Sequence, residues 1–113
     1  VTLSVNNDEL PVIQVTTSPA AFDNVISVSA SNPVLSLDAT VVDASGIDSL
    51  YILAATEGGV EVFTQSFDAS DVLEFNTGTI EITFPGVGLY DIELRALDVN
   101  GYENIWMREV QVQ

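Results

Sequence analysis

Apolar and polar residues alternate along most of this chain with a period of two. In the run 34–43, Leu35, Leu37, Ala39 and Val41 fall on one side, and Ser, Asp and Thr residues fall between them. That period predicts a strand with one buried face. Similar runs predict further strands over 11–17, 25–29, 47–56, 60–67, 79–84, 88–97 and 103–113. No stretch of about eleven residues has the 3.6-residue apolar period of a helix, so the sequence predicts an all-β fold.

Turn signals separate these runs. Asp43-Ala-Ser-Gly46, Glu57-Gly58-Gly59 and Asn100-Gly101 contain residues that accept tight turns and positive φ angles. Residues 68–77 are the least strand-like part, and a short turn of helix would fit there. Short strands joined by turns every eight to twelve residues or so are typical of a β-sandwich or barrel.

Two runs carry further expectations about the strands at the ends of the chain. Residues 25–29 fit the second half of a split first strand. In 103–113, Trp106, Arg108 and two valines share one parity, whereas Ile105 and Met107 share the other. Because both sets contain large apolar side chains, the parity alone does not say which set faces inward. The sequence therefore predicts a β-bulge near Arg108, at which the inward-facing set would change.

The stretch 86–101 predicts the architecture more closely. Tyr90 stands at the start of the strand 88–97, and Ile92 follows two residues later. In immunoglobulin-like sandwiches a tyrosine at this point packs into the edge of the core, and its hydroxyl binds backbone a few residues upstream. We therefore predict an immunoglobulin-like antiparallel β-sandwich of seven or eight strands over 10–113, preceded by a linker or N-terminal extension over 1–9.

The same stretch carries a family resemblance. Gly88-x-Tyr-x-Ile-x-Leu-x-Ala-x-Asp-x-Asn-Gly101, followed by a strand that ends Val-Gln-Val, resembles the C-terminal half of bacterial extracellular Ig-like repeats. Cadherin-like and PKD-like modules are similar, as are the Ig-like N-terminal domains of surface lipoproteins in Bacteroidetes glycan-uptake systems. The resemblance implies a module of a larger secreted or cell-surface bacterial protein, with neighbouring domains of the same chain as its partners. The lipoprotein members of this group imply anchoring in the outer membrane.

Charge restricts the partners further. The sequence has 17 acidic residues against two arginines, Arg95 and Arg108, and a net charge of −15. Such a chain repels phosphate backbones and anionic membrane surfaces, so nucleic acid is not an expected partner. No apolar run approaches the roughly 18 residues of a membrane span, so direct insertion is not expected either. Both arginines are expected to pair with neighbouring acids such as Glu93 and Glu109.

The residue inventory also argues against catalysis. The sequence contains no Cys and no His, which removes thiol nucleophiles and histidine-based triads. It contains no Lys that could act as a base for a serine nucleophile. Pairs of acids such as Asp91 and Glu93 point outward by parity, and no feature of the sequence around them predicts a cleft that could hold a substrate. We therefore expect a protein that is not an enzyme and that requires no cofactor.

One end of the predicted sandwich collects most of the acids in its loops. In the usual strand order this end holds Asp8, Glu9, Asp43, Asp48, Asp68, Asp71, Glu74, Asp98 and Glu103, whereas the other holds Asp23, Glu57 and, nearby, Glu61. Solvated loop acids are the simplest explanation. The alternative is a Ca²⁺ ion held by Glu9, Asp43, Asp98 and Asn100, oxygen donors from three segments that the fold would bring together. The cadherin-like resemblance also implies calcium at such an end, although the linker motif of that family is only approximated at Asn7–Pro11.

Trp106 and Tyr102 are the other candidate site. Exposed aromatic rings stack on the C–H faces of sugars, but a tryptophan half-buried against the sandwich edge would satisfy the same pattern. We therefore expect a structural or adhesive module. The alternatives are a carbohydrate-binding domain of a glycan-uptake lipoprotein, with these two residues as the platform, and an accessory domain beside a catalytic one. Another protein is a further possible partner.

Overall fold

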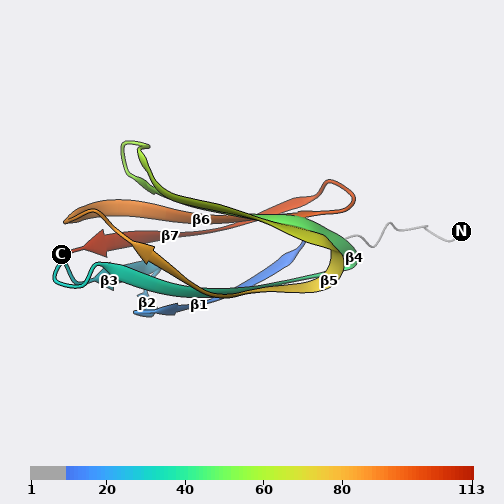
Figure 1. Ribbon diagram of the computed structural model, residues 1–113, viewed down its shortest axis with the longest axis horizontal. Helices are drawn as coiled ribbons and strands as arrows, with labels where there is room; N and C mark the ends of the chain where they lie inside the picture. The colour runs from blue at the N-terminus through green and yellow to red at the C-terminus, as the bar shows by residue number, and fades with distance from the viewer. Residues whose placement is uncertain (1–9) are drawn as a thin grey trace, which may run out of the picture.

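Seven β-strands make up the described part of the chain, residues 10–113, in the computed structural model (Figure 1). They are β1 Val12–Ser18, β2 Ala21–Phe22, β3 Val25–Val28, β4 Val34–Thr56, β5 Glu61–Thr83, β6 Gly88–Asp98 and β7 Glu103–Val112. These residues contain no helix, and therefore none that could cross a membrane. The all-β prediction is confirmed. The expected linker over 1–9 lies outside the described residues, and the domain boundary at residue 10 stays a prediction.

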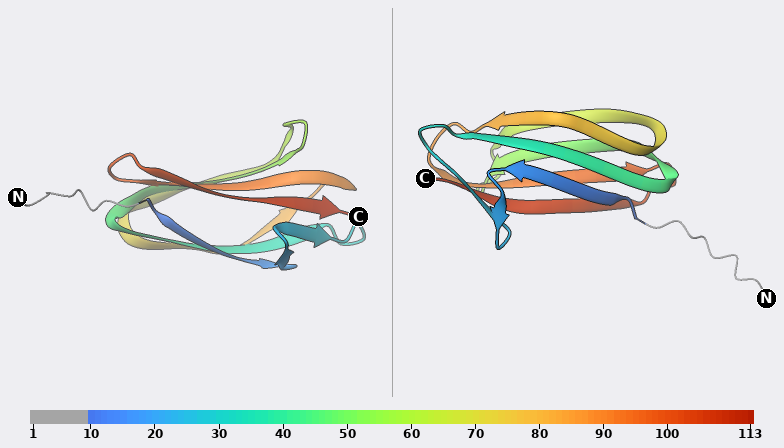
Figure 2. Two further views of the ribbon diagram at one scale, coloured as in Figure 1. Left: turned by 180° about the vertical axis from the view of Figure 1, so that it is seen from behind. Right: turned by 90° about the horizontal axis from the view of Figure 1, so that it is seen from below.

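The strands form the two layers of a sandwich (Figure 2). One layer contains β1, the first half of β4 and the second half of β5. The other contains the first half of β5, the second half of β4, then β6, β7, β3 and β2. All pairs are antiparallel except β3 with β7. Because β1 pairs with β4 whereas β3 pairs with β7, the first strand is split between the layers, as the sequence predicted.

The two longest strands cross from one layer to the other without a loop. The turn expected at 43–46 and the irregular segment expected at 68–77 both lie inside strands, which corrects those two predictions. Val42 still pairs with Glu74, and Ile47 with Val72, with a register shift between them. The turn-forming residues therefore bend β4 and β5 together, while backbone pairing persists on both sides of the bend.

The core lies between the layers and follows the predicted alternation. Leu35, Leu37, Ala39 and Val41 are buried, as the first layer's contribution. They meet the inward residues of the second layer, which include Leu50, Ile52, Ile92, Leu94, Ala96 and Val110. Burial of this apolar surface is the main stabilising contribution, at about 25 cal/mol per Å².

Tyr90 forms the predicted corner. Its side chain is 4% exposed, and its hydroxyl donates a 2.8 Å hydrogen bond to the carbonyl of Gly86. Its ring packs against Phe84, with 4.7 Å between ring centroids. The ring lies over the backbone of Gly88, where a Cβ would stand 3.7 Å from Tyr90 Cε1, an ordinary van der Waals contact. The immunoglobulin-like corner is confirmed in this geometry.

The bulge expected near Arg108 is absent. Pairing between β6 and β7 is regular from Gly88 to Leu97, with Leu94 opposite Trp106 and Ile92 opposite Arg108. The even-numbered residues of β7, which include Trp106 and Arg108, therefore face inward. Ile105 and Met107 lie on the exposed outer face. Polar Arg108 is tolerated there because its guanidinium carbon lies 4.6 Å from the centre of the Trp106 ring, a cation–π contact.

The described chain enters and leaves the sandwich at opposite ends (Figure 1). Near the start of β1, the Pro11 carbonyl accepts a 2.9 Å hydrogen bond from Asn104 Nδ2 at the beginning of β7. At the other end Gln113 N–H donates to the Val28 carbonyl at 3.0 Å, and Val112 pairs with Gly88. The first and last described residues therefore lie at opposite ends of the sandwich.

Candidate functional site

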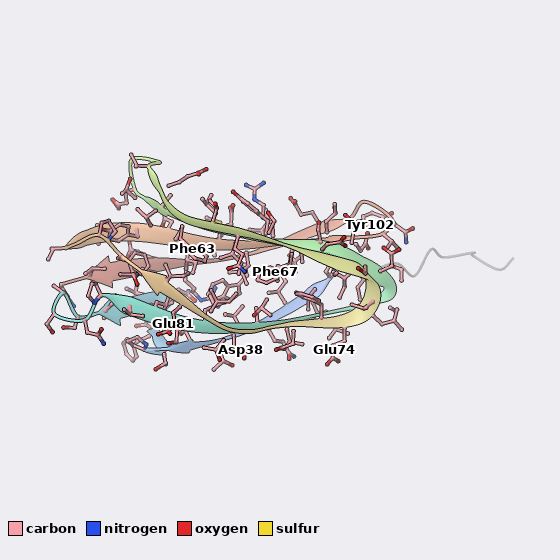
Figure 3. The ribbon with its side chains drawn as sticks, in the orientation of Figure 1. Asp38, Phe63, Phe67, Glu74, Glu81 and Tyr102 are labelled. Atoms are coloured by element: carbon pink, nitrogen blue, oxygen red, sulfur yellow. The ribbon has the colours of Figure 1, made fainter. Side chains whose placement is uncertain are left out.

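Three segments meet at the end of the sandwich where β1 begins, which we call the acidic end. They are the β4 bend at Gly46, the β5 bend at Asp71, and the β6–β7 turn at Val99. Val99 N–H donates to the Gly46 carbonyl at 3.0 Å. A Cβ on Gly46 would lie 2.9 Å from the Asp71 carbonyl oxygen and 3.3 Å from Val99 Cγ1, so the three backbones are in close contact. Figure 3 shows Tyr102 and Glu74 at this end.

Asp98 organises the β6–β7 turn. Its side chain is 1% exposed, and Oδ1 accepts hydrogen bonds from the backbone N–H groups of Asn100 at 2.9 Å and Tyr102 at 2.8 Å. Gly101 N–H donates to the Asp98 carbonyl at 3.1 Å, and Gly101 has a φ of +89°. The turn predicted at Asn100–Gly101 is therefore confirmed, and a buried carboxylate holds it in place.

Asp43 is the second buried acid at this end, in the β4 bend. It is 5% exposed, and Oδ1 accepts hydrogen bonds from Ser45 N–H at 2.8 Å and Ser45 Oγ at 2.5 Å. Oδ2 is also buried and has no hydrogen-bond partner in the described part of the protein. Burial of a charged oxygen is strongly unfavourable unless a partner compensates for its lost hydration. A bound water or a cation would supply the partner that Oδ2 of Asp43 lacks.

The remaining acids that the structure describes at this end are exposed. They are Asp48, Asp68, Asp71, Glu74 and Glu103. Across residues 10–113 no three acidic side chains lie close enough together to hold a metal ion. Of the four candidate calcium ligands, the fold brings Asp43, Asp98 and Asn100 to one end, and Glu9 lies outside the described residues.

Tyr102 and Trp106 do not form a paired aromatic surface. Tyr102 is 42% exposed in the β6–β7 turn. Trp106 is partly buried, packs against the core between the layers, and carries Arg108 over its ring. The only ring–ring contacts in the described residues are Phe84 with Tyr90 and Phe67 with Phe75. The proposed sugar platform therefore has one ring at the surface and the other turned inward.

The two arginines have different partners. Arg95 Nε lies 2.7 Å from Glu93 Oε2 on the outer face of β6, as expected. The hydrogen bond to Glu93 and the charge of its carboxylate raise the pKa of the Arg95 guanidinium above its ordinary value. Arg108 instead stacks on Trp106 and donates to the carbonyl of Met107 at 2.7 Å. Within residues 10–113 neither arginine forms an ion pair or hydrogen bond with Asp43, so neither supplies a partner for Oδ2.

Sequence reasoning missed the importance of Ser45 and Gly46. Ser45 donates twice to Asp43, and Gly46 brings the β5 and β6–β7 backbones together. The Asp-x-Ser-Gly pattern is a readable signal for the first role, because Asp side chains accept hydrogen bonds from backbone two residues later. The second role depends on two segments distant in sequence and has no local signal.

Comparison with known proteins identifies the fold. No protein-family model and no curated protein matches the sequence. Among solved structures, CopC from Methylosinus trichosporium OB3b is similar, with a TM-score of 0.52 and 20% identity over 92% of each chain. The CARDB domain of PF1109 from Pyrococcus furiosus, solved in complex with di-metal ions, gives a TM-score of 0.51 and 18% identity over 93% of this chain and 90% of that one.

A third similar structure is the PmoD soluble domain from Methylocystis sp. ATCC 49242. It gives a TM-score of 0.50 and 10% identity over 91% of this chain and 90% of that one. Identities this low carry the fold and nothing more. The chain is an all-β, immunoglobulin-like sandwich, and its resemblance to cadherin-like, PKD-like or lipoprotein modules remains a resemblance.

Proposed function

We propose that this protein is a non-catalytic module of a larger extracellular or cell-surface bacterial protein, and that its acidic end binds Ca²⁺. The observation that carries the calcium proposal is the buried Oδ2 of Asp43, which has no hydrogen-bond partner among residues 10–113. A cation at this oxygen would compensate for its lost hydration. It would also reduce the repulsion among the surrounding acids.

The donor chemistry at this end suits calcium. Ca²⁺ takes six to eight oxygen ligands from carboxylates, amides, carbonyls and water. We propose Asp43 as the central ligand, with Asp98, Asn100 and Glu9 as the further protein donors and water in the remaining positions. The CARDB domain with di-metal ions supports the idea that this type of sandwich can carry metal.

A soft-metal site such as copper is less well supported by the residues. Copper sites are built from imidazole, thiolate or thioether ligands. The sequence contains no His and no Cys, and its single methionine, Met107, is 53% exposed on the outer face of β7. Oxygen donors dominate the acidic end, so calcium is the better match.

The proposed role of the module is to hold its neighbours apart and in a fixed orientation. The described chain enters at the acidic end and leaves at the other, so neighbouring domains would lie end to end. A cation at the acidic end would then stiffen the junction with the preceding domain. The net charge of −15 makes an anionic partner unfavourable and keeps the surface soluble.

Calcium titration tests this proposal. We expect binding heat by calorimetry, and a rise in the midpoint of thermal unfolding when Ca²⁺ replaces EDTA. At a ligand concentration about 100 times the Kd, the stabilisation is about 2.7 kcal/mol. The Asp43→Asn variant should lose this response, whereas Asp23→Asn, a matched change at the opposite end, should keep it. Absence of any heat or shift in the wild-type chain would rule the calcium site out.

The carbohydrate-binding alternative at Tyr102 and Trp106 has less support, because Trp106 is turned into the sandwich. Quenching of Trp106 fluorescence by a sugar would favour it. The accessory-domain alternative predicts tight packing of this module on a catalytic domain of the same protein. Comparing the activity of such a protein with and without residues 10–113 would test it.

A further inference from the structure

A hydroxyl-rich surface covers the outside of the layer formed by β1, β4 and β5. Register places Ser18, Ser36 and Glu81 in one row across the three strands, and Thr16, Asp38 and Thr79 in the next. Neighbouring strands lie about 4.8 Å apart and alternate residues on a strand about 7 Å apart, so the six side chains form a regular grid. Figure 3 shows Asp38 and Glu81 on this face, along with Glu74.

Two hollows lie side by side over this grid and share Ser18 and Ser36. The smaller, of about 170 Å³, is lined by Thr16, Thr17, Ser18, Ser36, Leu37, Asp38 and Thr79. The larger, of about 360 Å³, is lined by Ser18, Pro19, Val28, Ser29, Asn32, Val34, Ser36 and Glu81. Together they form an elongated, open depression, which we call the serine groove.

The lining restricts the chemistry of a ligand. No basic residue lines either hollow, so phosphate, sulfate and carboxylate ligands have no counter-charge. No aromatic residue lines them either, so flat ring systems have no stacking surface. What remains is a set of hydroxyls, one amide and two carboxylates, next to apolar surface from Pro19, Val28 and Val34.

That combination suits a neutral sugar. A pyranose ring has apolar C–H faces and a rim of hydroxyl donors, and carboxylates and amides can accept or donate to that rim. Glu81 and Asn32 are exposed, and their side chains make no hydrogen bond within residues 10–113. Asp38 is held in place, because its Oδ1 accepts a 2.7 Å hydrogen bond from Asn76 Nδ2.

We propose that the serine groove binds a neutral oligosaccharide, with Glu81 and Asn32 on the hydroxyls of one sugar and Asp38 on those of the next. This site lies on the outer face of the β1–β4–β5 layer and reaches the end of β3 at Val28, and Trp106 does not line either hollow. It is also independent of the calcium proposal, because it uses none of the ligands at the acidic end. Two adjacent hollows favour a chain of at least two sugars over a monosaccharide.

Titration of the ¹⁵N-labelled protein, followed by NMR, tests the proposal. The probes are cellotetraose, xylotetraose, maltotetraose and laminaritetraose, with glucose as the single-sugar comparison and spermine as a cationic comparison. We expect saturable shifts at Ser18, Ser36 and Glu81 with at least one tetrasaccharide, weaker binding of glucose, and no change in Trp106 fluorescence. Each of these readouts can be collected in EDTA, so failure of the calcium proposal would leave it unaffected.

Two variants in the groove and one control variant make the test specific. Glu81→Gln removes a charged acceptor and should weaken tetrasaccharide binding about tenfold. Ser36→Val fills the point that the two hollows share and should weaken it as much. Glu61→Gln, the same change on the other half of β5, should have no effect. Three outcomes would each overturn the proposal. They are NMR shifts confined to Tyr102 and Trp106, saturable binding of spermine but of no sugar, and no saturable binding of any tetrasaccharide.

Discussion

Replacing Gly46 by alanine should destabilise the sandwich more than any other glycine-to-alanine change in the described chain. Gly46 has a φ of +113°, a conformation that costs an L-residue about 1–2 kcal/mol. The added Cβ would also lie 2.9 Å from the Asp71 carbonyl oxygen, which belongs to backbone and cannot rotate away. Forcing such a contact costs roughly a further 1–3 kcal/mol. The expected loss is therefore about 2–5 kcal/mol.

Two other glycines separate these contributions. Gly59 and Gly101 have φ angles of +91° and +89°, but a Cβ on either would have no atom within 4 Å. Gly59→Ala and Gly101→Ala should therefore show the conformational cost alone, about 1–2 kcal/mol. Urea unfolding followed by the fluorescence of Trp106, which packs against the core, measures all three. If Gly46→Ala cost no more than the other two, the close contact of three segments at the acidic end would be refuted.

Two further predictions concern single side-chain contacts. Tyr90→Phe should lower the free energy of unfolding by about 1 kcal/mol, because it removes one hydrogen bond. Gly86 is partly exposed, so water can bind its carbonyl in place of the hydroxyl. Thermal unfolding would measure the loss, and an unchanged midpoint would contradict it. Arg108→Gln should cost about 0.5–1 kcal/mol at any salt concentration through the Trp106 contact. Arg95→Gln should cost less, and only at low salt, since the Arg95 side chain is 46% exposed and its charge is screened by solvent. Equal costs for the two variants in high salt would contradict this reasoning.

The alternation of side chains predicted most of the fold because it reports burial directly. The alternate residues of both strands face the core as their parity required, namely Leu35, Leu37, Ala39, Val41, Ile92, Leu94 and Ala96. The corner at Tyr90 was also predictable, because its hydroxyl needs only the nearby Gly86. Both features depend on residues close together in the sequence.

The missed features depend on residues far apart. Asp43 to Gly46 have the composition and local hydrogen bonds of a turn, yet β4 stays paired with β5 on both sides of the bend. The facing of β7 was ambiguous in the sequence, and the bulge predicted near Arg108 is absent because β7 pairs regularly with β6 along its length. Arg108 lies on the inward side and stacks on the Trp106 ring.

The candidate sites show the same division. Two buried acids and an amide at one end were predictable from strand order, and so was their identity as oxygen donors. The lack of a hydrogen-bond partner for Oδ2 of Asp43 was not predictable, because it depends on which groups the folded backbone brings near that atom. The serine groove was missed entirely, since Ser18, Ser36 and Glu81 become neighbours only through strand register.

The passage of β4 and β5 through both layers has a consequence for how the protein opens. In a sandwich whose layers are joined by flexible connections, one sheet can fray while the other keeps its hydrogen bonds. Here each of the two longest strands belongs to both sheets, so loosening one sheet pulls on the backbone of the other. We expect the amides of both sheets to exchange with solvent deuterium in a single concerted event. The sandwich would then persist as one indivisible unit until it unfolds.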